Sequence, residues 1–384
     1  MKHFSDIPDL LAEREASHLL RRRVELQSAQ SVTPVIDGKL YLSFCSNDYL
    51  GLANHPVIAE RMKAAIDDYG VGAGASHLID GHHAEHEQLE RELATFCKRE
   101  AALVFSTGYM ANLGVMSALM ARQDSIVQDR LNHASLIDGA LLAQSNLLRY
   151  RHNDMAHLQQ MLESTSGKKL IVTDGVFSMD GDCAPLTEIA DIARQHNAWL
   201  MVDDAHGFGV LGPQGSGLVG QLGLDSQQVP LVVGTLGKAF GTSGAFVAGD
   251  QTTIDYLLQF ARTYMYTTAS PPSVAAATRQ ALQLVRQADD RRAHLTQRIA
   301  QLRNGIQAMG FSLMSSETPI QPVVVGANAD ALRLSAVLRE RDIMVTAIRP
   351  PTVPEGTARL RITLSASHTA EQVNSLLNAL DDVR

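Results

Sequence analysis

Three residues with chemically useful side chains follow two short apolar segments of the chain. Residues 199–202 lead into Asp203 and His206, and residues 231–233 lead into Lys238. Glycine and alanine flank Lys238, which leaves room for a bulky group to reach its amine. A lysine and a carboxylate at neighbouring strand ends suit pyridoxal phosphate, because the amine forms a Schiff base and the acid keeps the ring nitrogen protonated. The spacing therefore indicates a pyridoxal phosphate site.

A phosphate site is available after a third apolar segment. Residues 102–105 have the pattern of a strand, and Gly108 and Tyr109 then open an uncharged helix. The free backbone N–H groups and the dipole of such a helix bind a dianion. Thr235, which follows segment 231–233, can add a hydroxyl group. The alternative is that the same residues form an ordinary turn between a strand and a helix.

A glycine motif offers a competing cofactor. Residues 207–212 fit the pattern G-x-G-x-x-G and follow a strand, as in dinucleotide-binding folds. That fingerprint requires a helix to begin at the glycines, whereas Pro213 and Gly215 disfavour one. We interpret the segment as a loop, and an NAD-dependent dehydrogenase stays as the alternative from a different enzyme class.

His82, His83 and His86 raise the question of a metal site, because residues four apart share a helical face. The chain has no H-E-x-x-H motif, and His86 continues an apolar stripe with Leu89 and Leu93. We therefore interpret His86 as a partly buried structural histidine and expect no metal.

The region between about residues 100 and 250 alternates short apolar runs with helical patterns, which predicts a mostly parallel sheet with helices on both faces. Pro185 starts one of these helices. Ligands of α/β folds bind at the carboxyl ends of parallel strands, where Asp203 and Lys238 would lie. The fold class is therefore α/β, with expected strands at 102–105, 170–173, 199–202 and 231–233.

The last third of the chain is expected to form a smaller α+β domain, in which a long helical region precedes short strands and a closing helix. Its elements are a strand at 322–325, a helix at 331–342 and an alternating strand at 359–364. An amphipathic helix is expected over residues 8–23. The predicted domains are an N-terminal helix and arm (1–45), a large α/β domain (46–255), and a helical connection with the small domain (256–384).

The composition is that of an ordinary globular protein, with 384 residues, 45% hydrophobic residues and a formal net charge of −8. Acids spread along the chain do not suggest a nucleic-acid binder. The three cysteines form no C-x-x-C pair, and the first residues lack the apolar core of a signal peptide, so we expect a cytoplasmic protein. Polar residues interrupt the uncharged stretch 101–121, which we interpret as a buried strand and helix rather than a membrane span.

Along nearly its whole length the chain resembles the α-oxoamine synthases, which are fold-type I pyridoxal phosphate enzymes. The resemblance implies the fold-type I transferase fold, pyridoxal 5'-phosphate as cofactor, and a homodimer with its site at the subunit boundary. The matching stretches are 44–52 (FCSNDYLGL), 132–135 (NHAS), 175–182 (GVFSMDGD), 203–207 (DDAHG) and 235–238 (TLGK).

Segments outside the cofactor core resemble one subfamily, which condenses L-alanine with a pimeloyl thioester. The acyl donor this implies is pimeloyl-CoA or pimeloyl-ACP. An arginine near the acyl chain, such as Arg21, suits a pimeloyl group because that group ends in a carboxylate. The alternative is a related synthase that joins glycine or serine to a different acyl-CoA. The subfamily segments are 19–23 (LLRRR), 347–354 (AIRPPTVP) and 358–361 (ARLR).

The resemblance also implies roles for individual residues. Lys238 would bind the cofactor and move the Cα proton of the substrate, Asp203 would pair with the ring nitrogen, and Arg361 with Asn47 would bind the amino-acid carboxylate. The implied catalytic residues are Lys238, His133, Asp203 and His206. The implied cofactor contacts are Gly108, Tyr109, His133, Ser178, Asp203, Ala205, His206, Thr235, Lys238 and Thr268. The implied substrate contacts are Arg21, Asn47, His133, Thr352 and Arg361.

Two segments depart from the family pattern. Ala75 and His77 stand where glycine, or arginine in some relatives, is familiar. Ala269 replaces a serine in segment 266–272, which in relatives reaches across the dimer to the phosphate. Thr268 is therefore expected to make that contact here.

Overall fold

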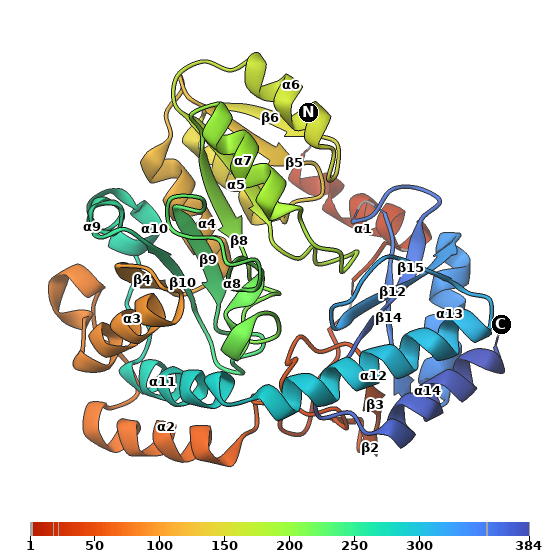
Figure 1. Cartoon of the computed structure of the whole chain (residues 1–384). Coiled ribbons are helices and arrows are strands. Elements are labelled where there is room, and N and C mark those ends of the chain that lie inside the picture. The colour runs from red at the N-terminus through yellow and green to blue at the C-terminus, as the bar shows by residue number, and fades with distance from the viewer. Residues whose placement is uncertain (1–2, 18, 22, 351, 384) are drawn as a thin grey trace.

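A seven-stranded sheet forms the centre of the computed structural model, which describes residues 3–17, 19–21, 23–350 and 352–383 (Figure 1). The strand order is β4-β10-β9-β8-β7-β5-β6. Neighbours from β9 to β6 run parallel, whereas β10 is antiparallel to both β4 and β9. The strands are β4 (Ala101–Phe105), β5 (Ser125–Asp129), β6 (Asn146–Tyr150), β7 (Lys169–Asp174), β8 (Trp199–Asp203), β9 (Leu231–Thr235) and β10 (Ala245–Gly249).

The four predicted strands are confirmed as β4, β7, β8 and β9, each within two residues of its expected ends. Their alternate side chains point to opposite faces, so that Phe105 joins one hydrophobic cluster and Val104 the other. Both faces are therefore apolar, as a sheet covered on two sides requires.

Helices cover both faces of the sheet (Figure 1). One face packs against α4 (Gly108–Leu119), α5 (Ala134–Ala143), α9 (Gln251–Phe260) and α10 (Arg262–Met265). The other packs against α3 (Ala84–Phe96), α6 (Met155–Glu163), α7 (Leu186–Gln195), α8 (Gly217–Gln221) and α11 (Pro272–Arg286). The expected strand and helix within 101–121 are confirmed as β4 and α4, and the helix expected at Pro185 is α7.

A second, antiparallel sheet lies in the C-terminal part, with the order β11-β12-β15-β14. Its strands are β11 (Ser312–Leu313), β12 (Ile320–Gly326), β14 (Thr346–Ile348) and β15 (Ala358–Thr363). The helices of this part are α12 (Asp289–Ala308), α13 (Asn328–Glu340) and α14 (Ala370–Asp381).

N-terminal segments pack on both parts of the molecule. Strand β3 (Leu42–Ser43) pairs in parallel with β13 (Ile343–Met344), and α2 (Pro56–Tyr69) packs on α11. The division at residues 45 and 255 stays a proposal. The remaining short elements are α1 (Ile7–Ala16), β1 (Val35–Ile36), β2 (Lys39–Leu40), and the short helices η1 (Phe4–Asp6), η2 (His77–Gly81) and η3 (Pro213–Gly215).

One expectation needs correction. The helix expected over 8–23 ends at Ala16, and no residue of α1 is buried. The long helical region is confirmed and consists of two successive helices, α11 and α12. On the final strand, β15, the side chains of Arg359 and Arg361 are buried by polar partners from segment 178–180.

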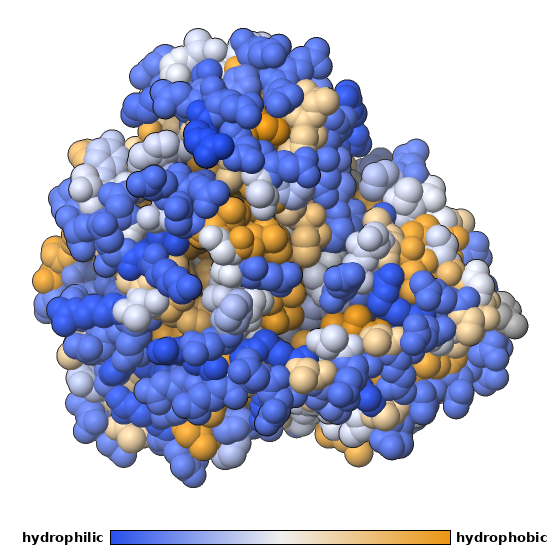
Figure 2. Space-filling model, in the orientation of Figure 1, coloured by the Kyte–Doolittle hydropathy of each residue, from blue (hydrophilic) through white to orange (hydrophobic). Residues whose placement is uncertain are grey.

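Polar residues dominate the surface of the face shown in Figure 2, and hydrophobic residues gather toward its middle. Among the described residues, no helix combines the length and the apolar character that crossing a bilayer requires.

Candidate active site

Lys238 lies just beyond the carboxyl end of β9, and its side chain is partly buried. Its Nζ atom is 2.9 Å from Nε2 of His206. Burial lowers the pKa of the amine to about 8, although Asp203 opposes the shift. Burial, followed by the charges of Lys238 and Arg361, lowers the pKa of His206 well below its usual value. A neutral imidazole therefore accepts a hydrogen bond from the lysine.

A chain of hydrogen bonds continues from His206 to the opposite side of the site. Nδ1 of His206 is 2.5 Å from the hydroxyl of Tyr49, which in turn donates to Oδ1 of Asn47 at 3.2 Å. The guanidinium of Arg361 donates to the same Asn47 oxygen, also at 3.2 Å. Because Lys238 donates to Nε2 of the neutral ring, Nδ1 of His206 carries the ring proton and donates to the Tyr49 hydroxyl, which donates in turn to Asn47.

Arg361 is a buried cation, and its hydrogen bonds within the described part of the chain go to uncharged groups. Its Nε donates to the carbonyl of Ser178 at 2.7 Å, and Nη1 donates to the hydroxyl of Thr363 at 2.8 Å. Arg359, two residues earlier, forms an ion pair with the carboxylate of Asp180. The positive charge of Arg361 is therefore left for a bound anion, and a planar carboxylate suits a guanidinium.

Asp203 ends β8 and is held in place by two donors. Nδ2 of Asn112 donates to Oδ2 at 2.7 Å, and the backbone N–H of Ala205 donates to Oδ1 at 3.1 Å. Asn112 also donates to the hydroxyl of Ser135, which is 2.8 Å from Nδ1 of His133. This network links Asp203 to His133, two residues that the sequence places seventy positions apart.

Asp174 is a second buried carboxyl group beside Asp203. It is the register partner of Asp203 on β7 and accepts a hydrogen bond from the His133 backbone N–H at 2.8 Å. Burial and the neighbouring Asp203 raise the pKa of Asp174 well above its usual value. Asp203, which two donors hold in place at the end of β8, is the acid that can face a protonated ring nitrogen.

The predicted phosphate site lies where two strands end. Phe105 of β4 and Thr235 of β9 are both register partners of Ala245, so Gly108 and Thr235 flank the same point of β10. Thr107 caps α4 by accepting from the Met110 N–H at 3.1 Å, and a Cβ added at Gly108 would meet nothing closer than 4.0 Å. The open helix N-terminus fits a phosphate. With the amine of Lys238 and the carboxylate of Asp203, the residues present fit pyridoxal phosphate.

A cavity of about 870 Å³ has a lining that includes His133, Ser178 and Thr352. Arg130 and Arg149 line it too. The fold therefore brings Thr352 toward the site from a segment more than two hundred residues distant from His133. The cavity is large enough for part of an extended acyl donor.

Some predicted residues lie apart from the network around Lys238. Arg21 is exposed in a stretch without regular structure, the Tyr109 hydroxyl donates to Asp138, and Thr268 forms an antiparallel bridge with Ser76. Their roles stay predictions. Arg22 and Pro351, which belong to the matching segments 19–23 and 347–354, lie outside the described residues.

Asn112, Tyr49 and Ser135 belong to the site although their side chains were not among the predicted site residues. Tyr49 and Ser135 stand inside the matching stretches 44–52 and 132–135. Asn112 carried a physical signal, because a buried amide in the uncharged helix 108–119 needs a hydrogen-bond partner.

The glycine motif at 207–212 does not begin a helix, which confirms that it lacks the dinucleotide fingerprint. Its first glycine has a packing role instead, since a Cβ at Gly207 would lie 1.9 Å from Oδ1 of Asp204. The expected burial of His86 is also confirmed. Its side chain is buried, and Nε2 lies 2.8 Å from the carbonyl oxygen of Ser270.

The chain is similar to known proteins along almost its whole length. The family model described as aminotransferase class I and II matches residues 40–380. The 8-amino-7-oxononanoate synthase of Cellvibrio japonicus (strain Ueda107) is 57% identical over 374 residues, which cover 97% of this chain and 94% of the relative.

Two solved structures have the same fold. Serine palmitoyltransferase from S. paucimobilis with bound PLP has a TM-score of 0.94 at 31% identity, with 100% of this chain and 98% of that chain covered. The 8-amino-7-oxononanoate synthase of Francisella tularensis has a TM-score of 0.79 at 34% identity, with 89% and 97% covered.

Proposed function

This chain belongs to the 8-amino-7-oxononanoate synthases of the class I and II aminotransferase family, and on that basis we propose that it condenses L-alanine with a pimeloyl thioester at Lys238. It is a pyridoxal phosphate-dependent acyltransferase of biotin biosynthesis. The products are 8-amino-7-oxononanoate, carbon dioxide and the free thiol of CoA or acyl carrier protein. The observation that carries the assignment of the site is the partly buried Lys238, whose amine lies 2.9 Å from a neutral His206.

Pyridoxal phosphate, when bound, accepts electron density from the bond that is broken at the substrate Cα. Asp203 keeps the ring nitrogen protonated, and Asn112 fixes the orientation of that carboxylate. The Lys238 amine, whose pKa burial lowers to about 8, holds and moves the Cα proton. His206 receives a hydrogen bond from this amine and so keeps it close to the reacting carbon.

Arg361 binds the carboxylate of L-alanine. Within the described residues, its hydrogen bonds go to uncharged oxygens of Ser178, Thr363 and Asn47, so a bound carboxylate would balance the buried positive charge. Asn47 holds one arm of the guanidinium in place. The amino acid is thereby oriented with its carboxylate at Arg361 and its Cα toward Lys238.

The acyl donor enters through the cavity that Thr352 shares with His133. The thioester carbonyl then meets the activated Cα, the new carbon–carbon bond forms, and the thiol leaves. The carboxylate of alanine departs as carbon dioxide because the adjacent ketone accepts the electrons. Arg21 is proposed to bind the far carboxylate of the pimeloyl group. The protein is further proposed to act in the cytoplasm as a homodimer, with Thr268 on the phosphate of the partner subunit's cofactor.

The experiment is thiol release from pimeloyl-CoA by the purified, cofactor-loaded protein, with L-alanine, glycine and L-serine compared at equal concentration. We expect release to be fastest with L-alanine. Palmitoyl-CoA with L-serine serves as the comparison, because solved serine palmitoyltransferases have the same fold. Faster release from that pair, or a preference for glycine, would contradict the proposed substrates.

A further inference from the structure

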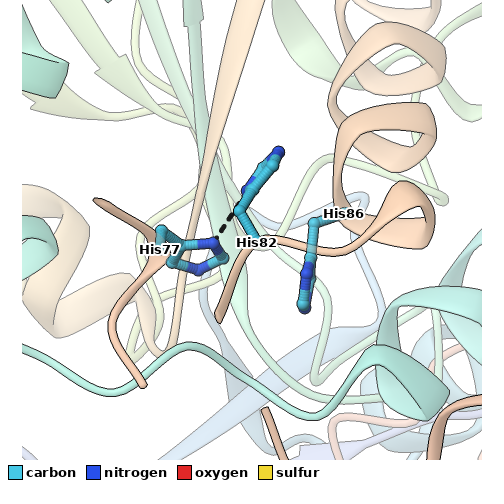
Figure 3. Close-up of side chains that lie close together, drawn as sticks. All are labelled: His77, His82 and His86. Atoms are coloured by element: carbon cyan, nitrogen blue, oxygen red, sulfur yellow. Dashed lines mark hydrogen bonds between the residues drawn. The ribbon is translucent and has the colours of Figure 1, made fainter. Parts of the chain in front are cut away.

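A cluster of three histidines, which among the described residues shares no hydrogen bond with the network around Lys238, lies beside the start of α3 (Figure 3). His77 comes from η2, His82 from the turn after it, and His86 from the first turn of α3. One ring nitrogen from each lies within 4.8 Å of the other two. The two Nδ1 atoms of His77 and His82 face each other at 2.9 Å. The spacing in the sequence suggests that His82 and His86 lie close together, and the structure shows that His77 lies beside them.

The hydrogen bonds of His82 leave its Nδ1 as an electron-pair donor. Nε2 of this ring lies 3.3 Å from a carboxylate oxygen of Glu87, which accepts a hydrogen bond from the ring N–H. The Nδ1–H of His77 therefore donates to His82 in the absence of a cation. Moving the His77 proton to Nε2 leaves two nitrogen lone pairs directed at one point. A carboxylate behind a ligating imidazole is the usual second layer of a zinc site.

The geometry is close to that of a bound ion. Two nitrogens at about 2.0–2.1 Å from one tetrahedral zinc ion lie roughly 3.4 Å apart, so His77 and His82 need to separate by only about half an ångström. His86 is oriented by two bonds, to the Ser270 carbonyl at 2.8 Å and from the His83 N–H at 3.0 Å. To bind the ion, one ring nitrogen of His86 must give up its hydrogen bond, and the hydrogen bond of the other nitrogen keeps the ring in place.

The cluster also has an open side. His77 and His82 line a cavity of about 690 Å³, from which water can supply a further ligand. On its other side His77 stacks on Tyr264, with ring centroids 4.9 Å apart. Three protein ligands and one exchangeable position make up a common coordination set for zinc.

We propose that His77, His82 and His86 bind one divalent transition-metal ion of the type that prefers imidazole, such as Zn²⁺. Glu87 and Glu90 also lie within ligand distance of His82, but each is engaged elsewhere. Glu87 forms an ion pair with Arg91, and Glu90 accepts from the backbone N–H of Val104. Glu87 acts as the outer carboxylate that orients His82.

The ion would join segments that carry predicted cofactor contacts. Ser76 forms an antiparallel bridge with Thr268, and the Ala269 N–H donates to the carbonyl of Ala75. His86 lies against Ser270 in the same segment. Binding would therefore fix residues 75–82 against both α3 and segment 268–270, and would stabilise the folded protein more strongly the more tightly the ion binds.

Calorimetric titration of the untagged, cofactor-loaded protein with ZnCl₂ tests the proposal, and the visible absorption of Co²⁺ reports the coordination geometry. Wild type is expected to bind one ion per chain. His77→Asn and His82→Asn should each bind at least tenfold more weakly, and Glu87→Gln about tenfold more weakly. His196→Asn, which changes a histidine at the end of α7, is the matched control and should bind as wild type does.

Far-ultraviolet circular dichroism and the cofactor absorbance confirm that each variant is folded, and His77→Gln replaces any His77 variant that is not. Two results would overturn the proposal. The first is the absence of saturable Zn²⁺ or Co²⁺ binding by the wild-type protein. The second is binding that survives His77→Asn but is lost in Glu90→Gln, or in His152→Asn, which tests the separate group His152, Asp180 and Asp182.

Discussion

Burial decides which residues around Lys238 carry charge. It lowers the pKa of Lys238 to about 8 and that of His206 well below its usual value. It also raises the pKa of Asp174, together with the charge of Asp203. The result is a lysine that is partly neutral near physiological pH, and a site whose groups fit the proton transfers proposed for them.

The lowered pKa of Lys238 predicts how fast the cofactor-free protein reacts with pyridoxal phosphate. Because only the neutral amine is nucleophilic, the rate should rise roughly tenfold per pH unit below about 8 and then level off, rather than rising up to the ordinary lysine pKa. Stopped-flow absorbance at constant ionic strength measures this profile. A rate still climbing steeply above pH 9 would show that the amine is not perturbed.

The two buried arginines of β15 should respond differently to the same substitution, one through substrate binding and the other through stability. Arg361→Gln should raise the KM for L-alanine at least about tenfold, because a charge-assisted contact to the carboxylate is lost. Arg359→Gln should mainly destabilise the fold, by about 3–5 kcal/mol, because it leaves the Asp180 carboxylate buried without its partner. Steady-state kinetics and thermal unfolding of both variants distinguish these roles. Equal effects on KM would contradict the assignment of Arg361.

The loop after β8 positions site residues through its packing around Asp204. The buried carboxylate of Asp204 accepts from the N–H groups of Leu218 and Val219 at the start of α8. Gly207 and Gly217 leave room for it, because a Cβ at either position would lie within 2.2 Å of an Asp204 oxygen. This packing turns the chain so that Asp203 and His206 face Lys238.

Gly207→Ala should therefore destabilise the protein by about 1–3 kcal/mol, because the added methyl group collides with Asp204. Gly72→Ala is the matched control, since its Cβ would meet nothing within 4 Å and its backbone φ is not positive. Thermal denaturation of both holoproteins checks the prediction. A Gly207 variant as stable as the Gly72 variant would argue against this role of the loop.

The strands around the site could be predicted because continuous apolar runs are typical of a sheet buried on both faces. Strand β10 was not among the predicted strands. Its sequence, Ala245–Gly249, also gives no sign that it runs antiparallel to its neighbours. The helix expected over 8–23 failed for another reason. The sequence beyond Ala16 still suits a helix, but a helix also needs packing against the protein. No described segment covers Ile7 and Leu11, two apolar residues of α1, which are exposed.

At the scale of the whole molecule, distant segments meet at one edge of the central sheet. Asn47, Ser178 and Arg361 lie in one hydrogen-bonded network, although more than three hundred residues separate the first from the last. The resemblance to the family could predict these residues, whereas their spacing could not. The links supplied by Tyr49 and Asn112 needed the fold, because a buried polar side chain reveals its partner only in three dimensions.

The proposed homodimer predicts a mass twice that of the chain in sedimentation equilibrium. If Thr268 reaches the phosphate of the partner subunit's cofactor, Thr268→Val should weaken pyridoxal phosphate binding about tenfold without dissociating the dimer. Absorbance titration with the cofactor, run beside sedimentation of the same sample, checks both statements. A monomeric protein with full cofactor affinity would contradict them.

Borohydride reduction of the holoenzyme, followed by peptide mass mapping, tests the central assignment most directly. Reduction converts the Schiff base into a stable secondary amine, so the modified lysine can be identified. We predict a single pyridoxyl group on the peptide that contains Lys238, and none in the Lys238→Ala variant. Modification of a different lysine in the wild-type protein, or the same extent of labelling in the variant, would contradict the account of the site.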